Sequence, residues 1–415
     1  MRLAIWLTNF CGRVYNNSPI NLINDCLADH DYLMPVYYID RRNLEKTSPL
    51  SNLPRLSNQR LSYLENQVKS LQQSLINIGL DLFIVNDIQA LTKQLNTLEH
   101  KYNQITLIYT KPDCYEENRW LNELLSNLSP IFRTICIGDT AATDLSNTTL
   151  TSYSFSSYSF SSWYNSLTIK PSRYLIDRNI KCKLPLVEEC ILTLDKLYYT
   201  EYKPQKYSIP CTEEEALVQF RDFVKDKLEN YQRDRNYFYQ NNTTRLEGVF
   251  NSGTLSRRMV FNILRNNGEL HLSRQMVFYD HNLLLYRHFG AKKWFSKDGL
   301  KSEGKNKREV NLEKFYDFVE NGCDNKLINY TLNQLKTEGY LNNRLRMIFA
   351  SYFCNKLNLD HRLGAELFEH YLLGFNPINN QAGWMWCAGL GNDSVPYPGR
   401  VFNINNQLYK YGKPA

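Results

Sequence analysis

Two arginines in an otherwise apolar helical segment are the residues of this sequence that most clearly need a charged partner. Arg344 and Arg346 lie in NNRLRMIFASYF, whose other residues have the composition of a buried helix. A buried arginine requires an anionic partner, because an unpaired charge is costly to remove from water. A phosphate or a carboxylate would serve. The segment therefore predicts an anion beside this helix.

The segment 379–403 has a composition that an ordinary packed helix does not have. NNQAGWMWCAGLGNDSVPYPGRVFN holds two tryptophans, four glycines and four asparagines in twenty-five residues. Glycine and asparagine favour turns and close approach of the backbone to a neighbour. Core packing explains the aromatic residues, but it does not explain the arginines and the glycine-rich segment together. The two segments favour a binding pocket over plain packing.

Three ungapped segments carry a resemblance to a known family. NNRLRMIFAS, LGAELFEHYLL, and Asn380-x-x-x-Trp384-x-Trp386 followed by GLGND resemble the flavin core of the cryptochrome/DNA photolyase family. The wording LGAELFE, FNP and GLGND is closest to DASH-type cryptochromes, whereas Met347 and Trp386 are typical of pyrimidine-dimer photolyases. The resemblance implies an α/β N-terminal domain with a doubly wound parallel sheet and an all-α C-terminal domain that binds FAD.

The resemblance also implies which residues hold the FAD. Thr243 to Leu246 resemble the family's phosphate loop, where hydroxyl and backbone N–H groups suit a pyrophosphate. The loop departs from the family pattern at Glu247 and Gly248, and a carboxylate there is unfavourable unless it points away or meets a cation. Asn380 is placed beside flavin N5, from which its amide oxygen can accept a hydrogen bond. The implied FAD contacts are Tyr231, Thr243, Thr244, Arg245, Leu246, Tyr340, Asn343, Arg346, Phe368, Asn376 and Asn380.

Two acids that are usual in this pocket are absent. Counting back from Asn380, their places are taken by Gly374 and Asn376. One of them normally pairs with the arginine that aligns with Arg346, so Arg346 is expected to lack a protein counter-ion. Two outcomes stay open: the free cation favours an anionic flavin, or the pocket no longer binds flavin tightly. Asn376 can still hydrogen-bond a ring edge.

The electron supply of the family is also altered. Its members pass electrons inward along three tryptophans, and Trp384 fills the inner of these places. His361 occupies the middle place, and the outer one falls near Phe318 or Val319. Imidazole and phenyl rings are harder to oxidise than indole, so photoreduction is expected to be slow. The implied catalytic residues are Gln275, Met347, Asn380 and Trp384.

DNA contact is implied by the segment QMVFYDHNLLLYRHFG and by a basic run after it. Gln275 replaces a glutamate and can donate to a pyrimidine carbonyl, but it cannot transfer a proton. Phe278 replaces a tryptophan and Tyr279 an arginine, while Asp280 is retained. The basic run 287–308 is either a solvated loop or a contact with the phosphate backbone. The expected lesion and DNA contacts are Gln275, Phe278, Asn343, Met347, Trp386, Lys292, Lys293 and Arg344.

The composition indicates a globular protein of two domains. Of the 415 residues, 43% are hydrophobic and 22% are charged, with a net charge of +7. No run reaches the roughly eighteen apolar residues of a membrane span, and the N-terminus lacks a signal pattern, so a cytoplasmic protein is expected. The ten cysteines form no C-x-x-C pair, which argues against a metal site. A monomer without a membrane partner is the expected state.

Alternating strand and helix signals predict the parallel sheet in the N-terminal part. Strands are expected at 3–8, 35–39, 81–85, 105–109 and 133–137, and an amphipathic helix is expected from Leu61 to Ile78, before Gly79. A Ser/Tyr/Phe-rich segment with YSFSSYSFSS follows. The expected organisation is an α/β antenna-type domain at 1–150, a connector at 151–200 and a helical FAD-binding domain at 201–415. The residues leave open whether a folate- or flavin-type antenna cofactor binds the first domain.

Three hypotheses for function remain open. The first is a flavoprotein that drives electron transfer by blue light from reduced FAD to a pyrimidine dimer in DNA, as a deoxyribodipyrimidine photo-lyase does. The second is a non-repair flavin-binding photoreceptor or regulatory nucleic-acid-binding protein on the same scaffold, and the third is a scaffold that has lost flavin. Met347 and Trp386 favour repair, the missing acids at 374 and 376 favour the other two, and Glu247 favours the third.

Overall fold

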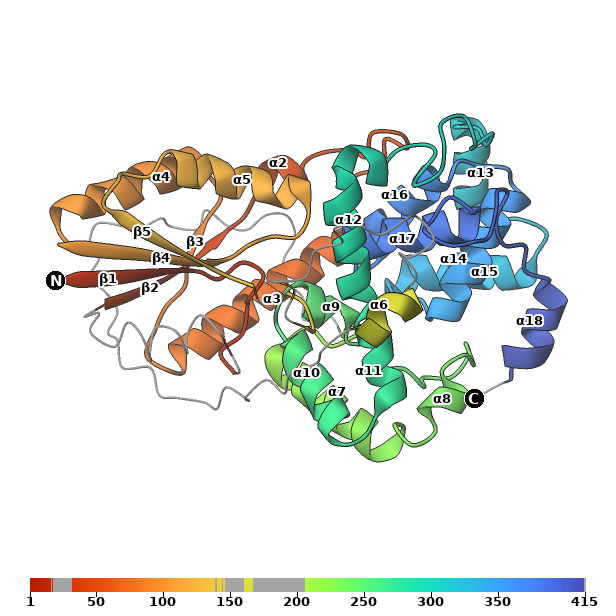
Figure 1. Cartoon of the computed structure of the whole chain (residues 1–415), viewed down its shortest axis with the longest axis horizontal. Helices are drawn as coiled ribbons and strands as arrows, with labels where there is room; N and C mark the ends of the chain where they lie inside the picture. Colours follow the sequence, from red (N-terminus) through yellow and green to blue (C-terminus); the bar gives the residue numbers. More distant parts are fainter. Residues whose placement is uncertain are drawn as a thin grey trace.

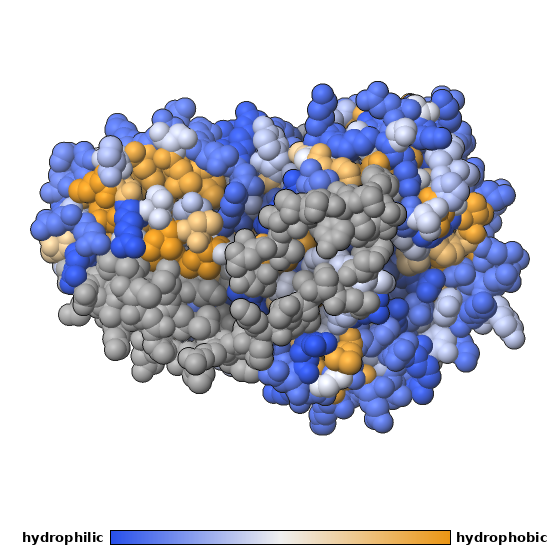
Figure 2. All heavy atoms as spheres, viewed as in Figure 1, coloured by the Kyte–Doolittle hydropathy of each residue, from blue (hydrophilic) through white to orange (hydrophobic). Residues whose placement is uncertain are grey.

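A computed structural model of the chain describes residues 1–15, 17, 32–138, 140–143, 145, 160–166 and 206–413. A sheet with helices on both faces forms one end of the molecule, and a larger group of helices forms the other (Figure 1). On the face drawn in Figure 2, hydrophilic side chains cover most of the described surface of the helical end, and an apolar area shows on the sheet end. None of the described helices is both long enough and apolar enough to span a membrane.

The sheet has five parallel strands in the order β3-β2-β1-β4-β5. Alternate residues of β1 pack against opposite layers: Leu3 and Ile5 join α4 and α5, whereas Ala4 and Trp6 join α3. This alternation confirms the predicted doubly wound sheet, because a central parallel strand is buried on both faces. The strands are β1 (Arg2–Leu7), β2 (Tyr32–Tyr38), β3 (Phe83–Val85), β4 (Gln104–Thr110) and β5 (Phe132–Ile137). The helices of this part are α2 (Arg41–Leu44), α3 (Asn58–Ile76), α4 (Ile88–Thr97), η1 (Leu98–His100) and α5 (Tyr115–Ser126).

The element boundaries lie close to those expected from the sequence. All five strands are present, and the largest shift is at β2, which begins at Tyr32, three residues before the expected start. Helix α3 begins after the cap Ser57 and ends at Ile76, and Gly79 follows with a φ of 78°. Residues 153–159 of the YSFSSYSFSS repeat lie outside the described residues.

The helical part carries most of the hydrophobic core. Its first long helix, α7, begins with a capping box: the Thr212 hydroxyl accepts from the Glu215 N–H, and the Glu215 carboxylate accepts from the Thr212 N–H. The helices are α6 (Phe160–Ser166), α7 (Glu213–Asp226), α8 (Tyr231–Asp234), α9 (Glu247–Asn251), α10 (Arg257–Asn266), α11 (Leu270–Met276), α12 (Phe278–Trp294), α13 (Leu312–Asn321), α14 (Lys326–Glu338), α15 (Asn343–Asn355), α16 (His361–Tyr371), α17 (Pro377–Ala388) and α18 (Ile404–Tyr411).

Polar contacts hold the two parts in a fixed relation. The buried Asp280 carboxylate accepts from the backbone N–H groups of Ala142 and Thr143, and burial raises the pKa of this carboxyl group. The Glu366 carboxylate accepts in the same way from Leu50 and Ser51. Asp280, which the sequence analysis treated as part of a DNA-binding segment, is therefore a structural anchor between the sheet and the helices.

Candidate functional site

A cavity of about 1720 Å³ opens among the helices of the C-terminal part. Pockets for single small molecules usually measure about 300–1,000 Å³, so this cavity can hold a large cofactor together with a second group. Its walls come from α8, α9, α11, α12, α15, α16 and α17, from the segment before α9, and from the segment after α17. Helices α15 and α17 belong to the two segments singled out by the sequence.

The cavity wall carries an excess of positive charge. Seven of its side chains are cationic and two are carboxylates, which favours an anionic ligand. The cations are Arg235, Arg245, Arg257, Lys301, Lys305, Arg344 and Arg346, and the carboxylates are Glu247 and Asp393.

The expected phosphate loop lies on this wall, with one correction. Thr243, Thr244 and Arg245 line the cavity, and the Thr243 hydroxyl lies 2.6 Å from the Tyr340 hydroxyl. Burial raises the pKa of the Tyr340 phenol to about 12, so its proton is kept. The Arg245 guanidinium lies 4.4 Å from the centre of the Tyr340 ring. Leu246 is fully buried in the helical core instead and does not line the cavity, so the expected contact of Leu246 with FAD is wrong.

Arg346 has a protein counter-ion, so the expectation of an unpaired cation is wrong. Its Nη2 lies 2.5 Å from Oε1 of Glu247, and its Nε donates to the Leu341 carbonyl oxygen at 2.9 Å. The carboxylate comes from the start of α9, at one of the two positions where the phosphate loop departs from the family pattern. Glu247 meets a cation there, which removes the objection to an acid in this loop.

The two asparagines expected at the flavin take different roles. Asn380 donates from Nδ2 to the Ala365 carbonyl oxygen at 3.0 Å, which fixes the orientation of the amide. Its Oδ1 makes no hydrogen bond within the described residues, and the side chain lines the cavity, so an acceptor is available there. Asn376 also lines the cavity, but its Oδ1 caps α17 by accepting from the Asn379 N–H.

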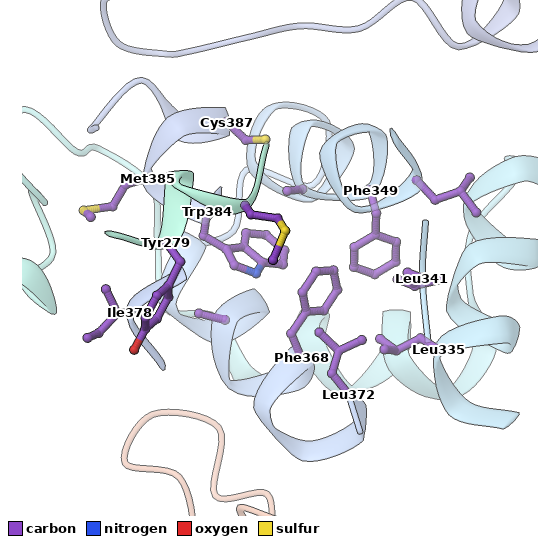
Figure 3. Packing of buried hydrophobic residues seen from close by; sticks show 14 of the residues in the cluster. Tyr279, Leu335, Leu341, Phe349, Phe368, Leu372, Ile378, Trp384, Met385 and Cys387 are labelled. Atoms are coloured by element: carbon purple, nitrogen blue, oxygen red, sulfur yellow. The ribbon is translucent and has the colours of Figure 1, made fainter. Parts of the chain in front are cut away.

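Three aromatic residues, Trp384, Phe368 and Phe349, lie close together in the core (Figure 3), and Trp384 and Phe368 line the cavity. Trp384 packs edge-on against Phe368 and Phe353, with ring centres 5.0 and 5.4 Å apart. The Trp384 Nε1–H is buried and has no partner among the described residues. Gly364 makes the packing possible, because a Cβ atom there would lie 2.1 Å from the Trp384 ring. Phe368 and Trp384 thus line the cavity together, and their contact with a flavin stays a prediction.

His361, which takes the place of the middle tryptophan in the family's electron route, is a neutral histidine. His361 is fully buried, and burial lowers its pKa to about 4. The Gln381 amide lies 3.2 Å from the His361 Nε2, and Nδ1 faces Asp360 at 3.4 Å. Phe318 and Val319, the two candidates for the outer place, are both buried in the core. The ring contacts of Trp384 within the described part of the chain all go to phenylalanines, including Phe349.

The residues expected to contact a lesion also line the cavity, but two of their aromatic faces are covered. Gln275, Asn343, Met347, Phe278 and Trp386 all contribute to the wall. The Phe278 ring stacks on Phe160 of α6, with centres 3.8 Å apart. The Arg400 guanidinium lies 3.4 Å from the centre of the Trp386 ring, and it is held there by Asp393 at 2.6 Å. A base could therefore stack only on the opposite faces of these rings.

The basic residues expected at DNA differ in their surroundings. Lys292 is exposed and Lys293 donates to the Lys301 carbonyl oxygen, and neither lines the cavity. Arg308, from the end of the basic run, is 1% exposed and donates to the carbonyl oxygens of Cys354 and Ala388. It is an internal structural arginine, so the interpretation of 287–308 as one surface run is wrong.

The guanidinium of Arg344 also contacts other side chains of the protein. It donates to the Asn236 side chain at 3.0 Å and lies over the ring of Tyr411. Sequence reasoning missed Lys301 and Lys305 as cavity residues, although both belong to the basic run. It also missed Glu247 as the partner of Arg346. The sequence did contain a signal for this pair, because an acid usual in the family is missing at 374 and an unusual acid is present at 247.

The comparisons with known proteins agree with this geometry. Residues 278–414 match the family model of the FAD binding domain of DNA photolyase. The chain is 30% identical over 207 residues to a deoxyribodipyrimidine photo-lyase of Alkalihalophilus pseudofirmus and 28% identical over 208 residues to a chloroplastic/mitochondrial cryptochrome DASH of Solanum lycopersicum. These matches cover 48% of this chain and 42% and 36% of the relatives, so the match spans less than half the length of these relatives.

Two solved structures have the same fold. A cryptochrome of Synechocystis superposes with a TM-score of 0.79 at 18% identity, covering 99% of this chain and 86% of that one. An archaeal photolyase of Sulfolobus tokodaii gives 0.72 at 21% identity, covering 99% and 87%. The chain thus has the architecture of an α/β domain joined to a helical domain of the FAD-binding type. Its helical part matches the FAD binding domain of DNA photolyase, and its fold is that of these cryptochrome and photolyase structures, in agreement with the resemblance seen in the sequence.

Proposed function

We propose that this chain binds FAD in the cavity of the helical domain and uses blue light to drive an electron from the reduced cofactor to a pyrimidine dimer in DNA. The observation that carries the proposal is the cavity of about 1720 Å³, whose wall combines the acceptor of Asn380 with an excess of cations. When bound, FAD supplies the light absorption and the electron. The residues of the chain bind and orient both ligands.

The chain's own residues suit the two ends of such a cofactor. The hydroxyls of Thr243 and Thr244 and the guanidinium of Arg245 are donors that would hold phosphates. Asn380 would hold the N–H of the ring system, because its Nδ2 is engaged by a carbonyl group and its Oδ1 is available. Phe368 and Trp384 exclude water from that end.

The remaining space suits a flipped pyrimidine pair. Met347 and Trp386 present apolar surface, and Gln275 offers an amide that can donate to a base carbonyl. Lys301 and Lys305 lie on the same wall and would contact the phosphate backbone. The proposed partner is therefore DNA that carries ultraviolet damage. We further propose that the protein acts as a monomer in the cytoplasm, which size-exclusion chromatography with light scattering and imaging of the tagged chain would test.

A second candidate is a flavin-binding photoreceptor or regulatory nucleic-acid-binding protein that does not repair. The stacking of Phe160 on Phe278 and of Arg400 on Trp386 favours it, because both expected base-stacking rings already have an aromatic or cationic neighbour. The neutral His361 in the electron route also favours it. The third hypothesis, loss of flavin, loses support because Arg346 is paired with Glu247.

The proposal is tested first by the absorbance spectrum of the purified protein, before and after heat release of any cofactor. Flavin bands in a stoichiometric amount are expected, and Asn380→Ala should weaken the binding. A dimer-containing oligonucleotide is then illuminated with blue light, and intact dimers are counted. Flavin without dimer loss would move the assignment to the photoreceptor, and a spectrum that stays bare of flavin after incubation with FAD would overturn both.

A further inference from the structure

The carboxylate of Glu247 occupies the space of a side chain that position 374 does not have. A Cβ atom built on Gly374 would lie 2.1 Å from Cγ and 3.2 Å from Cβ of Glu247. Two carbon atoms that are not bonded to each other cannot lie 2.1 Å apart, so a side chain at 374 and the present position of Glu247 exclude each other. Glu247, Arg346 and Gly374 all line the cavity.

The backbone around Glu247 holds this arrangement in place. The Asn251 Nδ2 at the end of α9 donates to the Gly374 carbonyl oxygen at 3.0 Å, which ties α9 to the turn before α17. On the other side of α9, a Cβ on Gly248 would lie 2.3 Å from the Tyr63 hydroxyl of α3. Since α9 is held between these two neighbours, Glu247 can leave Gly374 only by a shift of the helix or by a change of rotamer that takes its carboxylate away from Arg346.

Arg346 is fixed from the other side. Its Nε donates to the Leu341 carbonyl oxygen and its Nη2 to Glu247, so the guanidinium has two defined partners. About a quarter of the Arg346 side chain and 30% of the Glu247 side chain are exposed, toward a cavity that they both line. The pair therefore presents a neutralised arginine to whatever the cavity binds.

We infer that Glu247 of α9 is the counter-ion that positions Arg346. We also infer that position 374 must be glycine while Glu247 has this role, because a side chain at 374 would occupy the space of the glutamate. The inference rests on the proposed function where the ligand is FAD. If Glu247 has this role, the Arg346–Glu247 pair adds no net charge beside the cofactor. Without Glu247 the cavity gains an unpaired cation, which stabilises the more negative, reduced form of a bound flavin and moves its reduction potential to more positive values.

The first experiment needs no cofactor. Thermal unfolding of the apoprotein is compared for Gly374→Ala, Glu247→Ala and the double variant Glu247→Ala/Gly374→Ala. Gly374→Ala should lower the melting temperature in the wild-type background, and it should do so much less in the Glu247→Ala background, because alanine has no γ atom and the 2.1 Å clash is gone. Equal losses in both backgrounds would overturn the claim that the two positions share one space.

The second experiment moves the charge back. Glu247→Ala/Gly374→Asp supplies a carboxylate from position 374, whereas Glu247→Ala/Gly374→Ala places an uncharged side chain there. The Asp-containing variant should bring the reduction potential of bound FAD back toward the wild-type value, and the Ala-containing variant should keep the more positive potential of an unpaired Arg346. Equal potentials for these two variants would overturn the inference.

A charge control separates the local effect from a change in net charge. Glu247→Gln should shift the potential of bound FAD to more positive values, whereas Glu214→Gln on the exposed face of α7 should leave it unchanged. Equal shifts in the two variants, or none in either, would count against the inference. Failure of the wild-type protein to bind FAD would overturn the proposed function alone, because the unfolding experiment on the apoprotein does not depend on the cofactor.

Discussion

Replacement of Gly364 by alanine tests how tightly the aromatic wall is built. Gly364 lies in α16 against Trp384 of α17, and an added Cβ would meet three atoms of the indole ring at 2.1, 2.4 and 2.7 Å. The ring cannot simply slide along the wall, because Phe349, Phe353 and Phe368 surround it. It has to move toward the cavity or push the two helices apart.

The expected size follows from two opposing effects. Alanine in a helix interior gains about 1 kcal/mol over glycine. Overpacking a filled core costs about 1–3 kcal/mol, and three contacts this short place Gly364→Ala at the upper end of that range. The net expectation is a loss of about 2 kcal/mol in the free energy of unfolding of the helical part, or roughly 4–8 °C in melting temperature. FAD binding should weaken as well, because Trp384 lines the cavity.

The assay is urea and thermal unfolding followed by near-ultraviolet circular dichroism, with two comparisons. Gly383→Ala is the matched control, because a Cβ on this α17 glycine meets nothing within 4 Å, and it should stabilise the protein slightly. In a Trp384→Phe background the outer indole ring is absent, so Gly364→Ala should become neutral or stabilising. If Gly364→Ala destabilises the protein equally in both backgrounds, or not at all, the reasoning is refuted.

Three further predictions follow from the site. The free energy of unfolding should fall by about 3 kcal/mol as the pH is lowered from 6.5 to 4, because buried His361 has a pKa of about 4 and must stay neutral in the fold, and His361→Gln should remove this component. Photoreduction of bound flavin by an external thiol should be slow and almost unchanged in Trp384→Phe, since the ring neighbours of Trp384 in the described chain are phenylalanines. Lys305→Ala should reduce the slope of log K against log salt for DNA binding by about 0.9, whereas Lys314→Ala, which is exposed outside the cavity, should not.

Each of these has an outcome that would contradict it. A pH profile of His361→Gln that parallels the wild type would show that His361 does not titrate as its burial requires. Flavin bleaching that is rapid and falls steeply in Trp384→Phe would show that an electron route to the surface is intact. Equal salt slopes for the two lysine variants, measured by fluorescence anisotropy on one duplex, would place the DNA away from the cavity.

The fold could be predicted because its signals are local. Short apolar strands that alternate with helices determine a parallel sheet, and the alternating burial of Leu3, Ala4, Ile5 and Trp6 in β1 follows from the two-residue period of a strand. Asn380 and Trp384 could be placed on one wall because they are four residues apart on one helix, where such residues share a face.

The partners of charged side chains could not be predicted in the same way. Arg308 belongs to a basic run in the sequence, yet it is an internal donor to backbone carbonyl groups that follow it by 46 and 80 positions. Arg400 lies over Trp386 because the chain turns back after α17, and no spacing rule specifies this contact. The burial of a charge depends on the elements that surround it, so its role becomes visible only when those elements are placed together.

Arg346 shows why the absence of an acid at one position does not imply an unpaired charge. The sequence has glycine where an acid is usual at 374, and it has an acid where a small residue is usual at 247. Considered one at a time, the first change removes a counter-ion and the second brings a carboxylate toward a phosphate site. In the folded chain the two positions adjoin, with the Glu247 side chain in the space above Gly374 and its Oε1 on Arg346. The acid gained at 247 replaces the acid lost at 374 as the partner of Arg346, and its side chain fills the space above Gly374. Either change alone would leave a charge unpaired or two side chains in one space, so each is tolerated only together with the other.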